Sequence, residues 1–235
     1  MLTLSALIFD VDGTLADTEE AHRQAFNLAF AAAGLDWHWD QNLYTRLLSV
    51  TGGQARIGFF LEQSQRPALA DPHIAELHKS KTAFYVEAMQ AGRVPLRPGV
   101  ERLLCEARDQ GLTLAIATTT TPVNFQSLIE STLGRAALDW FAVIGAGDCV
   151  ENLKPAPDVY LWTLDRLGLE PSRCLAFEDS ANGLKAATAA GLATIVTPCP
   201  YTKDHDFTGA LSVHDNLDEP ERVDVAFLRQ LHGRL

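Results

Sequence analysis

The stretch Leu7-Ile8-Phe9-Asp10-Val11-Asp12-Gly13-Thr14 joins an apolar run to two carboxylates that stand two residues apart. The run from residue 4 to residue 9 is too short to span a membrane and rich in branched residues, so it predicts a buried strand. Asp10 then falls at the carboxyl end of that strand, where open α/β sheets carry their chemistry. Taken alone, two acids beside a glycine are equally typical of a solvated turn, so the rest of the chain has to distinguish the two interpretations.

The composition is that of an ordinary globular protein. The chain has 235 residues, of which 47% are hydrophobic, which suits one large domain or a core with a moderate insertion. Its formal net charge of -11 argues against nucleic acid and membrane as partners, because both favour a basic surface. A small anionic substrate held locally is compatible with that charge, and we expect a monomer.

The cysteines and the N-terminal region indicate a cytoplasmic protein. The four cysteines lie far apart and form no Cys-x-x-Cys pair or zinc-type spacing, so we expect buried thiols in a reducing compartment. The acids at positions 10 and 12 interrupt the first apolar segment too early for a signal peptide.

Helical patterns dominate residues 16–93. An apolar face recurs from Ala21 to Phe30 and stops at Gly34, and further helices are expected at 40–49, 53–65 and 71–90. Strand-like alternation is missing from this part of the sequence, and Trp37-His38-Trp39 is interpreted as packing. The segment 92–99 is rich in proline and glycine and would form a hinge. The pattern predicts an all-helical insert over residues 16–93.

From residue 100 onward, helices and strands alternate. We expect helices at 100–110, 122–133, 157–167, 181–190 and 223–231, and strands at 112–117, 142–144, 174–177 and 193–196. Such alternation is typical of βαβ units in a parallel sheet. The predicted fold class is therefore α/β, with residues 1–15 and 94–235 forming a core domain around the insert.

Polar groups follow the expected strands, and a doubly wound sheet brings such strand ends into one crevice. The set comprises Asp10, Asp12, Thr118, Thr119, Thr120, Lys154, Glu178 and Asp179. Each group alone fits a helix cap or a solvated turn, but their joint occurrence favours a site.

This set suits phosphoryl transfer through a covalent aspartyl phosphate. Asp10 would attack phosphorus as the nucleophile. Mg²⁺, which prefers hard oxygen ligands, would be held by Asp10 and Asp179, with Glu178 as a direct or indirect ligand. The backbone carbonyl of Asp12 offers a further ligand to the metal.

The remaining groups have tasks in the same reaction. Asp12 would protonate the leaving oxygen and later take a proton from the attacking water. The Thr118 hydroxyl and adjacent backbone N–H groups would hold phosphoryl oxygens, and Lys154 would balance the negative charge on nucleophile and phosphate.

These motifs resemble the four motifs of haloacid dehalogenase-like phosphatases. The resemblance lies in Asp-Val-Asp-Gly-Thr at 10–14, the strand ending in Thr118, Lys154-Pro155, and Glu178-Asp179-Ser180. It runs over nearly the whole chain and implies Mg²⁺-dependent hydrolysis of phosphate esters in a Rossmann-like core. The insert 16–93 corresponds to the helical cap that gates the site in that family.

Within the family, the sequence is most similar to the CbbY branch, near β-phosphoglucomutase. The similarity lies in Asp17-Thr18-Glu19 with His22, in Thr51-Gly52-Gly53-Gln54-Ala55-Arg56, and in His78-Lys79-Ser80-Lys81. That branch implies sugar bisphosphates as substrates, notably xylulose 1,5-bisphosphate, an inhibitory misfire product of Rubisco in the Calvin cycle. Thr118-Thr119-Thr120-Thr121 departs from the commoner Thr-Asn-Ser, so substrate contacts of the usual asparagine are not carried over.

A bisphosphate needs a second anion site away from the metal, and the cap provides groups for one. They are the successive N–H groups of Thr51, Gly52 and Gly53, Arg56 at a helix start, and Lys81 on another cap helix. A solvated loop and helix face is the alternative interpretation. A histidine on a helix face is often structural, but the closeness of His22 to Glu19 in the family pattern favours a role on a substrate hydroxyl or in a proton shuttle.

Three hypotheses follow for the function. The favoured one is a phosphatase for a sugar bisphosphate, and the nearest rival is a phosphomutase such as β-phosphoglucomutase, which uses the same acids. A third is a non-catalytic sensor that binds a phosphosugar and signals through cap closure. A dehalogenase is disfavoured because Asp12 and the acidic metal site would have no task there.

Overall fold

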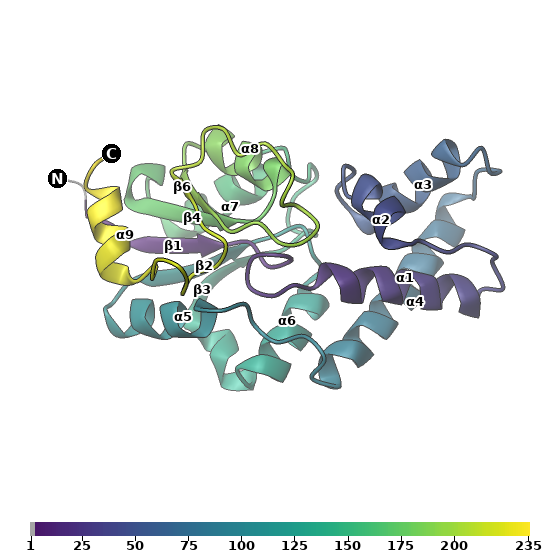
Figure 1. Cartoon of the computed structure of the whole chain (residues 1–235), viewed down its shortest axis with the longest axis horizontal. Coiled ribbons are helices and arrows are strands. Elements are labelled where there is room, and N and C mark those ends of the chain that lie inside the picture. Colours follow the sequence, from purple (N-terminus) through teal and green to yellow (C-terminus); the bar gives the residue numbers. More distant parts are fainter. Residues whose placement is uncertain (1–2) are drawn as a thin grey trace.

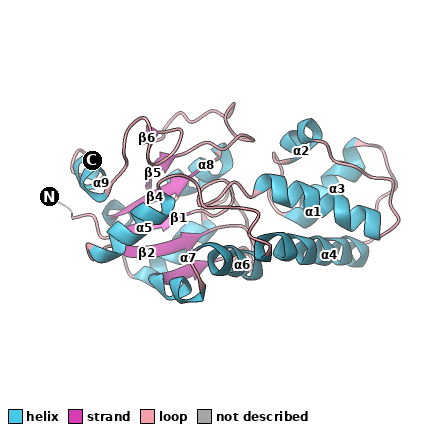
Figure 2. Ribbon diagram, turned by 60° about the horizontal axis from the view of Figure 1, so that its bottom comes forward, coloured by secondary structure: helices cyan, strands magenta, loops and turns pink. Residues whose placement is uncertain are grey.

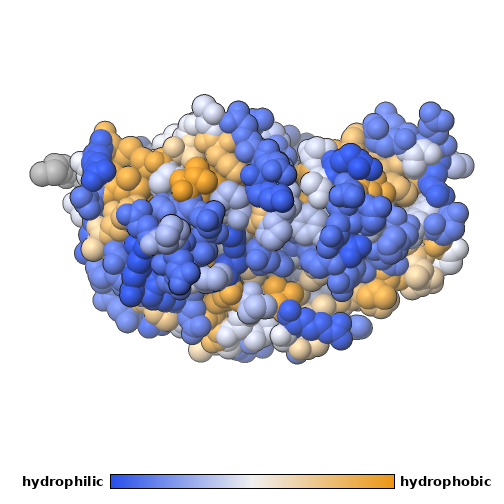
Figure 3. Space-filling view, viewed as in Figure 1, coloured by the Kyte–Doolittle hydropathy of each residue, from blue (hydrophilic) through white to orange (hydrophobic). Residues whose placement is uncertain are grey.

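The computed structural model describes residues 3–235, so the first two residues of the predicted core segment 1–15 lie outside it. Figure 1 shows a lobe built around a sheet beside a lobe made of helices. In the part of the chain described, no helix combines the length and apolar character that a membrane crossing requires. The face drawn in Figure 3 is mostly hydrophilic, with hydrophobic areas interspersed.

The core lobe contains a six-stranded parallel sheet with the strand order β3-β2-β1-β4-β5-β6. The strands are β1 (Ala6–Phe9), β2 (Thr113–Ala117), β3 (Phe141–Gly145), β4 (Cys174–Glu178), β5 (Ala193–Val196) and β6 (Ser212–Val213). Phe9 at the end of β1 pairs with Ile116 of β2 on one side and with Phe177 of β4 on the other. The carboxyl ends of these three strands therefore meet beside Asp10.

Strand β1 lies between β2 and β4, and both of its faces are buried. Leu7 and Phe9 belong to one hydrophobic cluster, whereas Ala6 and Ile8 belong to another, as the period of two in a strand requires. A strand covered on both faces is apolar at every position, which explains the run Ala-Leu-Ile-Phe.

Helices cover both faces of the sheet (Figure 2). Helices α5 (Val100–Asp109), α6 (Pro122–Thr132) and α9 (Val225–His232) pack with Leu7 and Phe9. Helices α7 (Asp158–Leu167) and α8 (Ala181–Ala189) pack with Ala6 and Ile8. The α/β fold class expected from the sequence is confirmed, and the structure adds the two-residue strand β6, which is too short to show a period.

The second lobe comprises α1 (Glu19–Ala32), α2 (Gln41–Leu47), α3 (Gly53–Gln63) and α4 (Asp71–Gln90). These four helices enclose a hydrophobic cluster that is rich in aromatic rings, called the aromatic cluster below. Trp37 and Trp39 are buried in this cluster, as predicted, but His38 is exposed and does not pack there. His38 lies in the irregular segment between α1 and α2, and its exposed side chain separates the two buried tryptophans.

Two chain segments connect the lobes, and they lie side by side. Ala16 and Leu96 form an isolated antiparallel bridge, so the chain enters and leaves the helical lobe at one place. The predicted domain boundaries at 15/16 and 93/94 stay predictions, as does the hinge. All four cysteines are free thiols, of which Cys174 and Cys199 are buried and Cys105 and Cys149 half-buried.

Candidate active site

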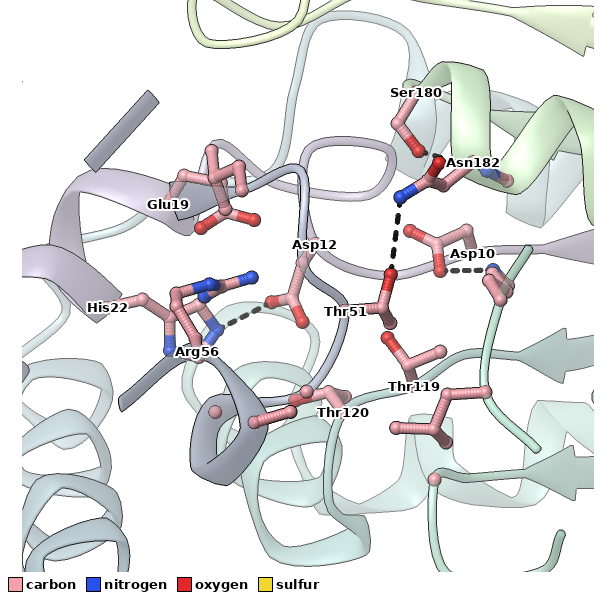
Figure 4. A pocket seen from close by; sticks show the side chains of 18 of the residues that line it. Asp10, Asp12, Glu19, His22, Thr51, Arg56, Thr119, Thr120, Ser180 and Asn182 are labelled. Carbon is pink, nitrogen blue, oxygen red and sulfur yellow. Dashed lines mark hydrogen bonds and ion pairs between the residues drawn. The ribbon is translucent and has the colours of Figure 1, made fainter. Parts of the chain in front are cut away.

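A cavity of about 440 Å³ lies between the two lobes, above the carboxyl ends of the central strands. All of the residues proposed from sequence line it except Thr118: Asp10, Asp12, Glu19, His22, Thr51, Gly52, Gly53, Arg56, Lys81, Thr119, Thr120, Lys154, Glu178 and Asp179. Figure 4 shows Glu19, His22 and Arg56 from the helical lobe facing Asp10 and Thr119 from the core. Tertiary folding therefore brings the predicted cap and core residues together.

Thr118 lies behind the cavity wall. Its side chain is 1% exposed, and its hydroxyl oxygen accepts a hydrogen bond from the Thr120 N–H at 3.2 Å. The Thr118 hydroxyl therefore already has a hydrogen-bond partner within the loop, and its predicted contact with a phosphoryl oxygen stays a prediction.

Asp10, Glu178 and Asp179 form a buried acidic cluster. One oxygen atom from each lies within 4.8 Å of the others. Burial raises the pKa of Asp10 to about 7, and burial together with the charges of Asp10 and Glu178 raises the pKa of Asp179 well above its usual value. Carboxylates gathered in this way need cations, and an all-oxygen set suits a divalent ion such as Mg²⁺.

Two glycines permit this close packing of the acids. A Cβ at Gly183 would lie 1.9 Å from Glu178 Oε2, and a Cβ at Gly13 would lie 2.2 Å from Asp179 Oδ2. Gly13 also has a φ of +81°, which disfavours any side chain. The carboxylates therefore lie directly against backbone, and the acidic cluster is typical of a divalent metal site.

Lys154 neutralises part of this cluster. Its Nζ lies 2.6 Å from Asp10 Oδ1, 2.6 Å from Glu178 Oε1 and 2.8 Å from the Ala117 carbonyl. Burial lowers the pKa of Lys154, but the two carboxylates outweigh burial and hold it above its ordinary value. The prediction that Lys154 ends a strand is wrong: it lies on the loop between β3 and α7, and only its long side chain reaches the strand ends.

Asp12 faces a different set of partners. Its Oδ1 accepts a hydrogen bond from the Thr18 hydroxyl at 2.6 Å and lies 2.9 Å from His22 Nε2 (Figure 4 draws the His22 contact). Burial raises the pKa of Asp12, but His22 and Thr18 outweigh it, so the carboxylate is ionised. The side chain of Asp12 does not belong to the buried acidic cluster of Asp10, Glu178 and Asp179. The predicted contact of its backbone carbonyl with the metal stays a prediction.

His22 connects Asp12 to Lys81. His22 Nδ1 lies 2.6 Å from Lys81 Nζ, and the imidazole stacks on Tyr85 with ring centroids 4.1 Å apart. Lys81 is 4% exposed, and burial lowers its pKa to about 8. The structure therefore ties Lys81 to Asp12 through His22, in addition to placing it on the cavity wall where a second anion was expected.

On the cap side of the cavity, a tyrosine that was not predicted from the sequence connects two of the predicted residues. The Tyr44 hydroxyl donates to Glu19 Oε2 at 2.8 Å and accepts from Arg56 Nη1 at 3.1 Å. Tyr44 is fully buried, so it fixes the two predicted substrate residues relative to each other. Neither its position nor its neighbours in the sequence distinguish it from an ordinary aromatic core residue.

Three further residues of the site were missed. Tyr160 donates to Glu178 Oε1 at 2.5 Å, and Asn182 donates across the cavity to the Thr51 hydroxyl at 3.3 Å. His78 lines the cavity, and burial and the nearby cations lower its pKa to about 4, so its imidazole is neutral. The spacing of His78 and Lys81 on one helix face was a usable signal.

Residues 4–191 match the family of haloacid dehalogenase-like hydrolases. The protein CbbY encoded on a plasmid of Cupriavidus necator is 52% identical over 92% of this chain and 87% of its own length. The chain belongs to the CbbY family of haloacid dehalogenase-like hydrolases.

Solved structures agree with this family assignment. The crystal structure of the D10N mutant of CbbY from Rhodobacter sphaeroides, in complex with xylulose-(1,5)bisphosphate, has a TM-score of 0.91 and 45% identity, covering 96% of this chain and 99% of that one. The β-phosphoglucomutase from Clostridium difficile shares the fold with a TM-score of 0.80 at 18% identity, covering 99% of this chain and 98% of that one. The resemblance to the family and to its CbbY branch is thereby confirmed.

Proposed function

We propose that the protein is a Mg²⁺-dependent phosphatase that hydrolyses a phosphate ester of a sugar through a covalent phosphate on Asp10. The placement of Asp10 carries this proposal, because its carboxylate belongs to the buried acidic cluster and opens onto the cavity between the lobes. A carboxylate in that position is suited to in-line attack at phosphorus. The proposed substrate is a sugar bisphosphate, xylulose 1,5-bisphosphate in particular, which the related CbbY of Rhodobacter sphaeroides holds in its crystal structure.

Charge balance supports the chemical step. Bound Mg²⁺ would neutralise phosphoryl oxygens, and the residues suited to hold it are Asp10 and Asp179, with Glu178 beside them. Lys154, in contact with Asp10, would keep the charge of nucleophile and phosphate balanced as the phosphoryl group approaches. The Thr119 N–H and the hydroxyl groups of Thr119 and Thr120, which line the cavity, would hold the remaining phosphoryl oxygens.

Proton transfer is the proposed task of Asp12. Because its carboxylate is ionised, Asp12 would first receive a proton across its hydrogen bond with His22 and pass it to the leaving sugar oxygen. It would then take a proton from the water that attacks the phosphate on Asp10. His22 Nε2 lies 2.9 Å from Asp12 Oδ1, so a proton held on His22 is one hydrogen bond away from the carboxylate that would use it. Lys81 would support this exchange by its contact with His22 Nδ1.

The second phosphate of the substrate would bind on the cap side. Arg56 lies in the first turn of α3, and the loop Thr51-Gly52-Gly53 precedes it, so a cation and helix N-terminal N–H groups face the cavity together. Arg56 Nε is buried and has no hydrogen-bond partner among residues 3–235, so it is a donor that an anion would satisfy. Glu19 would accept a hydrogen bond from a sugar hydroxyl between the two phosphates.

Incubation with xylulose 1,5-bisphosphate tests the function directly. We expect release of inorganic phosphate that stops when EDTA removes divalent cations and returns on addition of excess Mg²⁺, because the acidic cluster cannot otherwise accept an anionic substrate. Phosphate release is measured by a colorimetric assay, and sugar products by chromatography. An isomeric sugar phosphate without free phosphate would instead identify a mutase, and tight binding without turnover across a panel of phosphorylated sugars would identify a sensor.

Arg56→Ala is expected to lower kcat/KM for the bisphosphate far more than for p-nitrophenyl phosphate. A charge-assisted hydrogen bond contributes about 1.5–3 kcal/mol, so its loss corresponds to roughly 10- to 100-fold on the bisphosphate. A short monophosphate already meets Lys154 and the metal site and does not need the cap arginine. Steady-state kinetics on both substrates provide the measurement.

Arg46→Ala is the matched control for that experiment, because Arg46 is an exposed arginine on α2 that lies outside the cavity. We expect it to leave both substrates unchanged. Equal proportional losses on the two substrates in Arg56→Ala would assign Arg56 to folding or to the common phosphate site, and would contradict its role in binding the second phosphate.

A further inference from the structure

The aromatic cluster of the helical lobe is contacted by a side chain from the core. Among residues 3–235, Tyr201 is the one side chain from beyond residue 93 that packs against that cluster, and it is half-buried there. Its ring packs edge-on against Tyr44, with centroids 5.7 Å apart and planes at 87°. Such T-shaped pairs are directional as well as hydrophobic. The ring of Tyr201 therefore fixes the orientation of the cap at the tyrosine that holds Glu19 and Arg56.

The hydroxyl of Tyr201 makes a second contact with the cap. It donates a hydrogen bond to Glu20 Oε2 on α1. The same carboxylate is held by Arg23 at 2.5 Å, which also lowers the pKa of Glu20 to about 2, and Arg23 in turn donates to the Trp39 carbonyl at 2.7 Å. The acceptor of Tyr201 is therefore ionised and anchored to the interior of the cap.

The loop that carries Tyr201 is also attached to the acidic cluster. The next residue, Thr202, donates through its hydroxyl to Asp179 Oδ2 at 3.2 Å, and that hydroxyl accepts from the Cys199 N–H at 2.9 Å. Within the turn 199–202, Thr202 therefore contacts the buried acidic cluster and Tyr201 contacts the cap. If the cap moves relative to Asp179, either the contacts of Tyr201 and Thr202 break or the turn 199–202 moves with the cap.

We propose that Tyr201 is a positioning residue that holds the cap residues Glu19 and Arg56 at a set distance above Asp10 and thereby selects substrates with two anionic ends. The two connecting segments lie together at the Ala16–Leu96 bridge, so contacts elsewhere must determine the orientation of the cap. On one side, α4 of the cap packs against α6 of the core, and Tyr85 and Met89 share a hydrophobic cluster with core residues. Beside the cavity, Tyr201 and the Asn182–Thr51 hydrogen bond supply the contacts. A substrate that needs both Arg56 and Asp10 requires that orientation, whereas a short monophosphate does not.

Tyr201→Phe tests the positioning role, because it removes one oxygen atom and keeps the ring. We expect kcat/KM for xylulose 1,5-bisphosphate to fall roughly 3- to 10-fold, as for one hydrogen bond, while p-nitrophenyl phosphate changes less than about twofold. Glu20→Ala, which also removes the Arg23 contact, should lose at least as much, and adding Tyr201→Phe to it should cause no further loss, because the shared hydrogen bond is already gone. Asp36→Asn, which breaks an exposed ion pair within the cap, is the control and should change neither substrate.

Tyr201→Ala extends the test to the ring and is expected to increase the difference between the two substrates. Thermal unfolding of each variant shows that the chain remains folded. Equal losses on both substrates, additive effects of Tyr201→Phe and Glu20→Ala, or unchanged kinetics would each overturn the positioning role.

This inference rests on the proposed function, and absence of turnover in the unmodified protein would contradict that function instead. In that case, calorimetry with xylulose 1,5-bisphosphate decides the matter: unchanged affinity in Tyr201→Phe would still overturn the positioning role.

Discussion

Replacing Asp10 with asparagine is expected to abolish phosphate release and covalent labelling of the protein by substrate. The amide nitrogen of asparagine has no lone pair available to attack phosphorus, and the covalent route accounts for the whole proposed turnover. The side chain keeps its volume, so the contacts of the buried site have room to persist. Phosphate release is measured over hours at high protein concentration, together with trapping of the phosphorylated chain by acid quench.

Binding provides the control for Asp10→Asn. The relative from Rhodobacter sphaeroides was crystallised with its bisphosphate in the D10N form, so we expect the same substitution here to retain measurable affinity in calorimetry. Cooperative thermal unfolding should also persist. Residual hydrolysis above roughly a few per cent of the unmodified rate would exclude Asp10 as the nucleophile, since general acid–base help alone would then account for turnover.

Asp12→Asn is expected to slow turnover by roughly 10²- to 10⁴-fold, the range for loss of a general acid and base. The carboxylate lies outside the buried acidic cluster, so divalent cation binding should be retained while both chemical steps are slowed. Rapid-quench measurements separate formation of the phosphorylated chain from its hydrolysis. An effect on both phases is expected, because the same carboxylate would first give and then take a proton.

Asp109→Asn serves as the matched control for Asp12→Asn, because Asp109 is an exposed residue of the core whose carboxylate is hydrogen-bonded to the neighbouring Arg108 side chain and lies outside the cavity. Its rate should equal that of the unmodified protein. An unchanged rate in Asp12→Asn, or a loss explained entirely by weaker Mg²⁺ binding in a titration, would remove Asp12 from proton transfer.

The sequence was informative wherever local pattern and topology coincide. The run from Leu7 to Phe9 predicted a buried central strand because both faces of β1 are covered by apolar groups. Asp10 and Asp179 could then be placed together without any contact information, because parallel strands expose their carboxyl ends at one edge of the sheet. The helical insert was equally readable, since its apolar positions recur with a period close to 3.6.

The finer arrangement of the site could not be predicted in this way. Thr118 follows a strand as expected, yet its side chain is buried behind the cavity wall, whereas the next two residues, Thr119 and Thr120, line the cavity. Lys154 reaches Asp10 from a loop, which no strand-end rule anticipates. In both cases the deciding quantity is the direction of a side chain, and secondary structure alone does not set it.

The sequence by itself determined the fold class, the acidic cluster and the family to which the chain belongs, because each depends on short-range patterns and on the rules of parallel sheets. Only the tertiary structure decided that Lys81 meets Asp12 through His22, and that Tyr201 reaches across to Glu20 and Tyr44. These contacts join residues that are distant in the chain and lie on separate lobes or helices. Their geometry depends on how the cap packs against the core, and that packing is a collective property of many side chains that no local stretch encodes.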